Sequence, residues 1–360
     1  MESSLYNMAY AHSIDGLINP GRFQSAWANL TNSAPVLKTT VKVQNGVAVQ
    51  CFDAQIDDLK IIDLSRSNDS VEESKRWMTL RLGNVFNLEK CLIDAALLKL
   101  SESRWIFFCN QHHLITDAWS SQLIWGMLTA RYFSDEALPE QELKESQENY
   151  PYTDYLAVES RKVLEADNAH WQNRQSPAPI VLYGLEKTSE HTDAIRIDND
   201  LNRDQVITLE HLANLKTARS INPQISKYHV LLAVYVVYLS RVSGQQQLTL
   251  FTPVLNRDNH AWRNTPGLFT ELVPLNFKLS DDNTLDAVIG MVREELSLCL
   301  KNAGAGVSNV VSQPGSTAVF NYINAQPADF SEFKATAKWL HNGHMAVSYT
   351  HLTLPTIYSV

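Results

Sequence analysis

Residues 105–120, WIFFCNQHHLITDAWS, join an apolar run to a pair of histidines and then to the start of a helix. The run WIFFC is typical of a buried β-strand, which would hold His112 and His113 at its end. After Asp117, apolar residues recur every three to five positions as far as Phe133, a pattern that predicts an amphipathic helix. The stretch therefore predicts a strand, a short loop and a helix, with an imidazole presented at the loop.

Two residue types in this loop carry chemistry. Histidine suits proton transfer near neutral pH because its reference pKa is roughly 6.5. An aspartate at a helix start, such as Asp117, caps free N–H groups or pairs with a cation. The spacing alone fits a catalytic site and a hydrogen-bonded structural turn equally well. A metal site is disfavoured, because His112 and His113 would point in opposite directions on an extended segment and the chain has no HExxH.

The regions around this stretch alternate between helical and strand patterns. Phe23, Ala26, Trp27 and Leu30 recur at helical spacing. VLKTTVKV, at 36–43, predicts a strand that turns at Asn45-Gly46 into a hairpin partner, and a polar helix is expected over 70–83.

The second half of the chain repeats this mixture. A long helix is expected to begin with Ser226 as N-cap and to end at Gly244. Strands are expected at LTLFTPV (248–254) and TAVFNYI (317–323), with an amphipathic helix at 284–301 between them. Each half thus combines strands with helices packed on them, which predicts a layered α/β (α+β) fold.

Composition excludes several classes of protein. The 360 residues carry a formal net charge of −9, so we expect no nucleic-acid partner. The four cysteines form no CxxC pair, which fits a reducing cytoplasm. The apolar run HVLLAVYVVYL (229–239) is too short to predict a membrane span, and the N-terminus lacks a signal-peptide pattern. We expect a cytoplasmic protein without a membrane partner.

The segment HHLITDAWS resembles the HHxxxDG motif of the condensation domains of nonribosomal peptide synthetases, in which the second histidine is catalytic. Further segments resemble motifs of that family in the same order along the chain: VLKTTV (36–41), FNL (86–88), YTDYLAVE (152–159), AHWQNR (169–174), TPVLNR (252–257), PGLFTELVPL (266–275) and VFNYIN (319–324). This order is far more specific than the histidine motif alone.

The resemblance implies a chloramphenicol-acetyltransferase-like architecture, in which two α/β lobes form a V around a tunnel that holds the active site. We expect residues 1–165 to form the lobe with the HHxxxD motif and 166–347 to form a second, incomplete lobe. Residues 348–360, SYTHLTLPTIYSV, resemble a tail found on unrelated translated reads, and we expect them to be non-native. A terminal strand is the alternative interpretation.

The resemblance also implies the reaction. A donor carrier domain brings an acyl or peptidyl thioester on a 4′-phosphopantetheine arm, and an acceptor carrier domain brings an aminoacyl thioester whose amine attacks the donor carbonyl. An adenylation domain in the same or a neighbouring chain is a further expected partner, and no cofactor is expected in the domain itself. His113 would act as a general base, position the amine or stabilise the tetrahedral intermediate.

By the same resemblance, other residues receive supporting roles. Asp117 is expected to pair with Arg257, and His112 to support the loop. Ala118 stands at the position of the family glycine, where a small residue leaves room for the thioester. Three further residues are expected as possible lining of the tunnel: Ser120, Asn321 and Tyr322.

The chain departs from the family pattern at several positions: Ser33, Ala34 and Pro35 in place of Arg-His-Glu, Lys38 and Asp94 in place of arginines, Glu271 in place of asparagine, and Asn276 in place of arginine. The opening motif before Leu5 and the closing motifs are absent, so a fragment is expected. Two alternatives to peptide synthesis remain open: a stand-alone CoA- or carrier-dependent acyltransferase and an inactive carrier-docking module. Epimerization and cyclization domains are disfavoured, because Trp119 precedes Ser120 and the histidines are retained.

Overall fold

The computed structural model describes residues 4–134, 152–157, 169–172, 180, 195–257, 259–303, 318–323, 329–343 and 348–353. The chain divides into two compact units. Unit 1 comprises Met1–Val158, Arg257–Phe269 and Ala325–His344, and unit 2 comprises Glu159–Asn256, Thr270–Asn324 and Met345–Val360. Both units are discontinuous, whereas the sequence analysis expects continuous lobes that meet at 165/166, a point outside the described residues. Residues 257–269 and 325–344 are the segments that belong to unit 1 instead.

Unit 1 is built on a five-stranded sheet with the order β10-β1-β6-β5-β4. The strands are β1 (Asn7–Asp15), β4 (Lys60–Asp63), β5 (Ile93–Ser101), β6 (Arg104–His112) and β10 (Lys334–Leu340). β6 lies between β1 and β5 and is antiparallel to both, while β4 runs parallel to β5. The late segment β10 joins this sheet because it pairs with β1 from Ala9↔Leu340 to Asp15↔Lys334.

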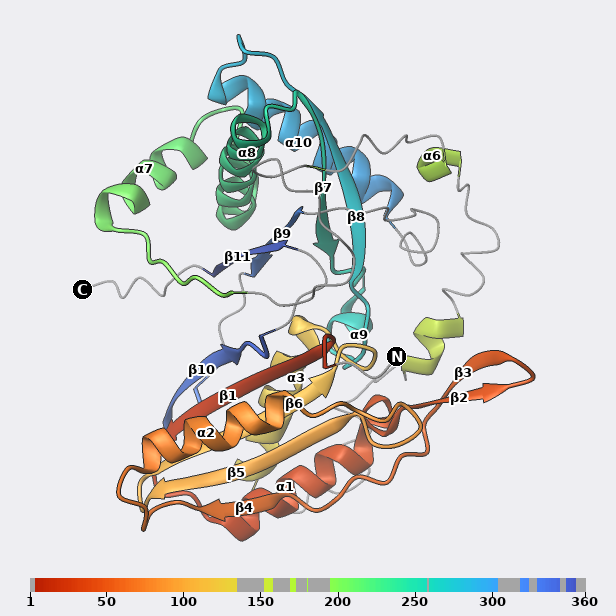
Figure 1. The fold of residues 1–360 in the computed structure, drawn as a ribbon, viewed down its shortest axis with the longest axis vertical. Coiled ribbons are helices and arrows are strands. Elements are labelled where there is room, and N and C mark those ends of the chain that lie inside the picture. Colours follow the sequence, from red (N-terminus) through yellow and green to blue (C-terminus); the bar gives the residue numbers. More distant parts are fainter. Residues whose placement is uncertain are drawn as a thin grey trace. The chain divides into compact units, whose positions relative to one another are not determined.

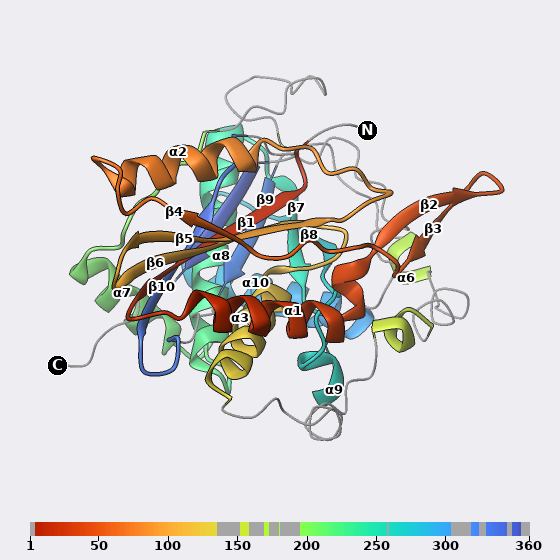
Figure 2. The same ribbon diagram turned by 90° about the horizontal axis from the view of Figure 1, so that it is seen from below.

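Helices cover both faces of this sheet, so β6 is buried on both sides (Figure 2). One face packs against α1 (Pro20–Ser33) and α3 (Ala118–Phe133), and it includes Phe107 and Cys109 of β6. The other face packs against α2 (Ser70–Leu82) and includes Ile106 and Phe108. This alternation follows from the two-residue period of a strand. The strand and helix that flank the histidine pair are thus confirmed.

A second, two-stranded sheet is formed by β2 (Thr40–Gln44) and β3 (Val47–Cys51). The predicted Asn45-Gly46 turn is confirmed, since both residues have positive φ angles of 52° and 80°. The predicted strand start at Val36 is wrong, because Pro35–Lys38 form a 3₁₀ helix, η1. Pro35 occupies the first position of that helix, and Val36 and Leu37 are buried in the core beside α1.

Unit 2 contains a four-stranded sheet with the order β11-β9-β7-β8 (Figure 1). The strands are β7 (Gln247–Val254), β8 (Glu271–Lys278), β9 (Ala318–Ile323) and β11 (Ser348–Thr353). The helices are α6 (Ala169–Gln172), α7 (Arg203–Ala213), α8 (Pro223–Ser243) and α10 (Leu285–Asn302). A single apolar core joins α8 and α10 to this sheet and includes Cys299. The short helix α9 (His260–Arg263) lies in the segment that belongs to unit 1.

The ends of α8 test the predicted caps. Gly244 ends the helix in the left-handed conformation (φ 69°), as predicted. The predicted N-cap at Ser226 is wrong: the helix begins one turn earlier, where Asn222 accepts a hydrogen bond from the N–H of Gln224 and Pro223 takes the first helical position. By length and composition α8 qualifies as a candidate membrane span, but it packs through Val230, Leu232 and other residues into the core of unit 2. One such helix is weak evidence for a membrane protein.

The end of the chain also enters this sheet. Residues Ser348–Thr353, which the sequence analysis assigns to a non-native tail, form β11 and pair in parallel with β9 from Ser348↔Ala318 to Thr353↔Ile323. The alternative interpretation as a terminal strand therefore describes the observed conformation, while the origin of the segment stays a prediction.

Candidate active site

Strand β6 delivers the histidine pair to the end of the sheet of unit 1. Its last residue, His112, pairs with Asn7 of β1, and its N–H donates to the carbonyl of Leu92. The next N–H, that of His113, donates to the carbonyl of Tyr6 at 2.8 Å. The chain then turns, since the N–H of Ile115 donates to the carbonyl of His112. The backbone of both histidines is therefore held on two sides.

The side chain of His112 is buried and has defined partners. Its Nδ1 accepts a hydrogen bond from the N–H of Leu114 at 3.1 Å, which places the proton of the neutral ring on Nε2. The rings of Tyr6 and Phe86 lie 6.0 and 6.2 Å from it. Burial, together with the neighbouring His113, lowers the pKa of His112 to about 4. His112 is therefore a neutral, fixed member of the loop.

His113 differs from its neighbour. His113 is half-buried, and its imidazole makes no hydrogen bond to the part of the chain that the structure describes. The backbone is nevertheless fixed by Tyr6 and by the turn that follows. The imidazole is thus an available proton acceptor or donor on a held backbone.

Asp117 is the N-cap of α3 and is buried, with 1% of its surface exposed. Its carboxylate accepts from the N–H of Ser120 at 2.7 Å and from the N–H of Phe269 at 3.1 Å. Nη2 of Arg257 lies 3.3 Å from each carboxylate oxygen, which is the pairing that the sequence analysis expects. A buried charge requires such partners, because an unpaired carboxylate would be costly to desolvate.

Arg257 serves more than one acceptor. Its Nη1 donates to the carbonyl of Thr265 at 2.7 Å and to that of Trp262, and its Nη2 donates to the Ser120 hydroxyl at 2.7 Å. The guanidinium carbon lies 3.9 Å from the centre of the Phe269 ring. Burial lowers the pKa of Arg257, and the charge of Asp117 opposes this shift. The guanidinium stays protonated and holds the loop 257–269 against α3.

The expectation that Ser120 is possible tunnel lining is corrected by the structure. Ser120 is 0% exposed, and its hydroxyl donates to the carbonyl of Gly267 at 2.6 Å. The same oxygen accepts from the N–H of Gly267 at 2.9 Å and from Arg257. With one donor and two acceptor sites used, the hydroxyl is saturated. Ser120 therefore belongs to the Asp117–Arg257 cluster.

Three predicted site residues remain: Ala118, Asn321 and Tyr322. Ala118 is the first residue of α3 and is not among the described residues with positive φ, so alanine causes no backbone strain there. Asn321 and Tyr322 are half-buried in β9 of unit 2. The hydroxyl of Tyr322 donates to Gln224 at 2.8 Å, and burial raises its pKa to about 12. Their role as tunnel lining stays a prediction.

The sequence analysis missed several residues that complete the cluster. A Cβ at Gly267 would lie 2.3 Å from the ring of Tyr152, so only glycine fits this close approach. The hydroxyl of Tyr152 donates to the carbonyl of Leu268 at 2.8 Å, and Tyr155 lies 4.2 Å from the Phe269 ring. These residues lie in two motifs that the sequence analysis recognises, at 152–159 and 266–275. A motif alone does not show that the residues of one contact those of the other.

Two departures from the family pattern have local partners. Asp94 of β5 accepts from Nε of Arg81 at 2.7 Å, and the pair is part-buried. The side chain of Asn276 accepts from the Thr249 hydroxyl at 2.7 Å across the β7–β8 pair. The polar side chain at each of these two positions therefore has a hydrogen-bond partner within the chain.

Metal ligation finds no support in the described residues, which contain no group of three or more His, Cys, Asp or Glu side chains able to hold an ion.

The family model of the condensation domain matches residues 1–348. The chain therefore belongs to the condensation-domain family of the nonribosomal peptide synthetases, an acyltransferase class associated with peptide-bond formation. Its fold is chloramphenicol-acetyltransferase-like.

Particular relatives support this assignment. One of the linear gramicidin synthase proteins of Brevibacillus parabrevis is 27% identical over 302 residues, which cover 81% of this chain and 4% of that protein. Cyclosporin synthetase of Tolypocladium inflatum is 23% identical over 334 residues, 88% of this chain and 2% of that protein. The chain thus spans less than a tenth of the length of these curated relatives.

Solved structures agree in fold. The starter condensation domain of rhizomide synthetase, in a mutant form, has a TM-score of 0.79 at 20% identity, covering 99% of this chain and 82% of that one. The first condensation domain of the calcium-dependent antibiotic synthetase, in complex with a substrate analogue, has a TM-score of 0.79 at 19% identity, covering 98% and 83%.

Proposed function

We propose that this chain is a condensation domain that joins a carrier-bound acyl or peptidyl thioester to the amine of a carrier-bound aminoacyl thioester. His113 is the catalytic residue of this reaction. The observation that carries the proposal is the contrast within the loop: His112 and Asp117 are buried and bonded, whereas the imidazole of His113 is half-buried without a hydrogen bond to the described chain.

The acceptor amine loses a proton as it attacks the donor carbonyl, and the tetrahedral intermediate then collapses with cleavage of the thioester C–S bond and release of the donor's phosphopantetheine thiol. The imidazole of His113 accepts this proton, or it positions the amine and stabilises the tetrahedral intermediate. The carboxylate of Asp117 already serves two N–H groups and Arg257. Asp117 and Arg257 therefore act as a scaffold for the loop, and Ala118 leaves room beside the reacting carbonyl.

The partners follow from the chemistry of tethered substrates. The donor and acceptor carrier domains each supply a thioester on 4′-phosphopantetheine, and an adenylation domain loads the amino acid. The domain itself holds no cofactor. Such an assembly operates in the cytoplasm, independently of membranes and nucleic acids.

A substitution at His113 tests this assignment in the full-length synthetase that contains the domain. With both carriers loaded, His113→Ala is expected to lower the rate of amide formation by roughly 10²–10⁴-fold, while circular dichroism stays unchanged. The matched control is His211→Ala, which removes an exposed imidazole of α7 and leaves the rate unchanged. A His113→Ala enzyme with the wild-type rate would overturn the catalytic role.

The same assay separates the other candidate functions. Product from an acyl-CoA donor and a free amine, without carriers, would favour a stand-alone acyltransferase. Carrier binding without turnover in the wild-type protein would favour a docking module. Amide formation that depends on both loaded carriers supports the proposed function.

A further inference from the structure

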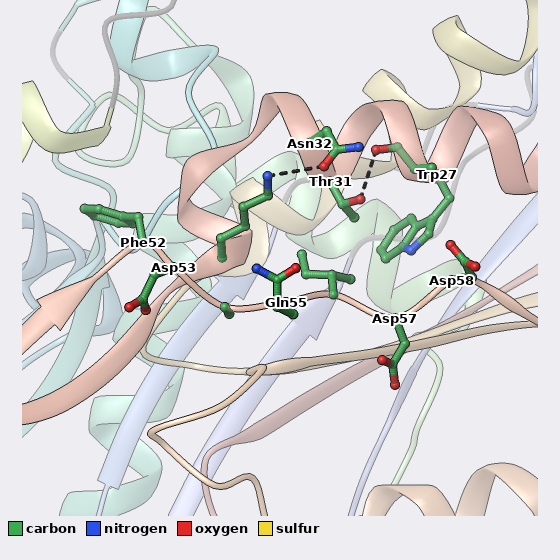
Figure 3. Close-up of a pocket in the computed structure, with 12 residues that line it drawn as sticks. Trp27, Thr31, Asn32, Phe52, Asp53, Gln55, Asp57 and Asp58 are labelled. Atoms are coloured by element: carbon green, nitrogen blue, oxygen red, sulfur yellow. Dashed lines mark hydrogen bonds between the residues drawn. The ribbon is translucent and has the colours of Figure 1, made fainter.

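Unit 1 contains a cavity that is separate from the histidine loop. It has a volume of about 270 Å³ and lies between α1 and residues 52–58, the segment that follows β3 (Figure 3). Its size is just below the roughly 300–1,000 Å³ of pockets for drug-sized ligands, so it suits a single small metabolite. None of the residues assigned to the reaction lines it.

The floor of this cavity presents an unused polar group. Trp27 is 2% exposed, and its indole N–H donates no hydrogen bond to the described residues. Figure 3 shows its ring directed from α1 toward the segment that carries Gln55 and Asp58. The indole N–H is a donor that an acceptor atom of a ligand can use.

One end of the cavity is rich in hydrogen-bond donors. Nζ of Lys38 donates to Oδ1 of Asn32 at 3.2 Å, which leaves the amide NH₂ of Asn32 and two further N–H groups of Lys38 for a ligand. Gln55 lies toward the same end and adds a second amide (Figure 3). A cation and two amides form a site for a carboxylate, because charge-assisted hydrogen bonds are the strong ones.

The other end of the cavity is acidic. Figure 3 shows Asp58 beyond Trp27, on the side away from Asn32, and Asp58 has no ion pair within the described residues. Asp53 is different, because Lys42 and the hydroxyl of Thr40 already occupy its carboxylate. The carboxylate of Asp57 points away from α1 (Figure 3). Asp58 is thus the carboxylate available to a positively charged group.

We infer that this cavity binds a free α-amino acid, with its carboxylate at Lys38, Asn32 and Gln55 and its ammonium group at Asp58. A cavity with a donor-rich end and an acidic end suits a zwitterion. It is less suited to a simple anion or a simple amine, which would leave one end without a charged partner. The apolar side chains of Phe52 and Ile56 form a wall for a small aliphatic side chain. The site is additional to the proposed function, since its ligand is free and carries no carrier arm.

Lys38, which lines this cavity, is also a position singled out in the sequence analysis. It is one of the positions where the chain departs from the family pattern, and it lies at the end of η1. A lysine places a compact charge on a flexible stem, which here reaches Asn32 of α1.

Calorimetry with the 360-residue chain tests the inference. The probes are L-leucine, isopentylamine, which lacks the carboxylate, and 4-methylpentanoate, which lacks the ammonium group. L-leucine is expected to bind saturably, and each analogue to bind at least about tenfold more weakly because one charged contact is lost. Lys38→Met and Asp58→Asn are each expected to weaken L-leucine binding about tenfold, whereas Asp57→Asn, the matched control, changes it less than about twofold.

Three outcomes would overturn the site: absence of saturable L-leucine binding at millimolar concentration, equal binding of either analogue, or an equal effect of Asp57→Asn. The histidine variant separates this site from the catalytic one. His113→Ala is expected to bind L-leucine with unchanged affinity, and a loss of binding in that variant would place the ligand at the catalytic loop instead.

Discussion

Nη2 of Arg257 lies 2.7 Å from the hydroxyl oxygen of Ser120, although the two residues are 137 positions apart in the chain. Ser120 belongs to the first turn of α3, directly behind the HHLITD loop, and Arg257 begins the segment 257–269. The contact therefore fixes the helix start against a segment from the second half of the sequence. The carboxylate of Asp117 accepts from Arg257 and from the backbone N–H of Ser120, and the carbonyl of Gly267 accepts from both side chains.

Arg257→Ala is expected to lower the free energy of unfolding by about 3–5 kcal/mol, because it leaves the buried carboxylate of Asp117 without its cation. Urea denaturation followed by tryptophan fluorescence measures this loss. Arg257→Lys is expected to recover only part of it, since an ammonium group cannot reproduce the guanidinium fork. The exposed Arg293→Ala is the control, with a change within about 0.5 kcal/mol. Equal losses in the two alanine variants would contradict the role of the buried pair.

Ser120→Ala is expected to cost about 1–3 kcal/mol, because the N–H and carbonyl of Gly267 lose a buried partner. Ser25→Ala, on the exposed face of α1, is expected to change stability by less than about 0.5 kcal/mol. The same denaturation experiment measures both variants. If Ser120→Ala were as neutral as Ser25→Ala, its hydroxyl would not be an essential part of the cluster.

Gly267→Ala is expected to cost about 1–3 kcal/mol, since its Cβ would clash with the ring of Tyr152. In a Tyr152→Ala background the cost of Gly267→Ala should fall, and a double-mutant cycle measures this coupling. Gly290→Ala in α10 is the matched control, because a Cβ there meets no atom within 4 Å. That control should stabilise the protein by about 0.5–1 kcal/mol. Additive effects in the cycle would argue against the clash.

Stability should fall as the pH is lowered from 6.5 toward 4, and His112 should contribute to that fall. The pKa of its imidazole is lowered to about 4 in the folded protein from an ordinary value of 6.5. Between these values the unfolded chain binds the proton and the folded chain does not, so acid favours unfolding. Above pH 6.5 both states are neutral and this contribution to the pH dependence vanishes.

Urea midpoints at pH 7 and pH 5 measure this dependence. His112→Gln is expected to reduce the difference between the two midpoints, and His211→Gln, which replaces an exposed histidine, should leave it unchanged. Part of the dependence remains in His112→Gln, because burial also lowers the pKa of His12, to about 3. An unchanged difference in His112→Gln would show that this imidazole is not held neutral.

The parts of the fold that sequence predicts well are those set by local pattern. The two-residue alternation of β6 and the repeat of apolar residues in α3 reflect burial on defined faces, so both elements were predictable. The start of α8 was not predictable in this way, because Ser226 is also a good capping residue. Only Pro223, at the first helical position, identifies Asn222 as the N-cap. The strand expected at Val36 failed for a similar reason, because Pro35 starts a 3₁₀ helix that buries Val36 and Leu37 without strand pairing.

The site was predictable only in part, because its contacts join distant segments. The motif order pointed to Asp117 and Arg257, and the structure places them together. It did not reveal that Ser120 is enclosed, nor that Gly267 must lack a Cβ to admit Tyr152. Periodicity and motif spacing describe neighbours along the chain, whereas these relations depend on how three separate segments pack.

The allocation of Arg257–Phe269 to unit 1 bears on attempts to recombine this domain with its relatives. A crossover between lobes near residue 165 would take Asp117 from one parent and its arginine, with the whole loop to Phe269, from the other. Chimeras made at that point would combine Asp117 from one parent with the arginine and supporting loop of the other. These two parts would not have evolved to pack against each other. Grafts that move residues 257–269 together with the N-terminal unit keep the helix start and its supporting loop from one parent.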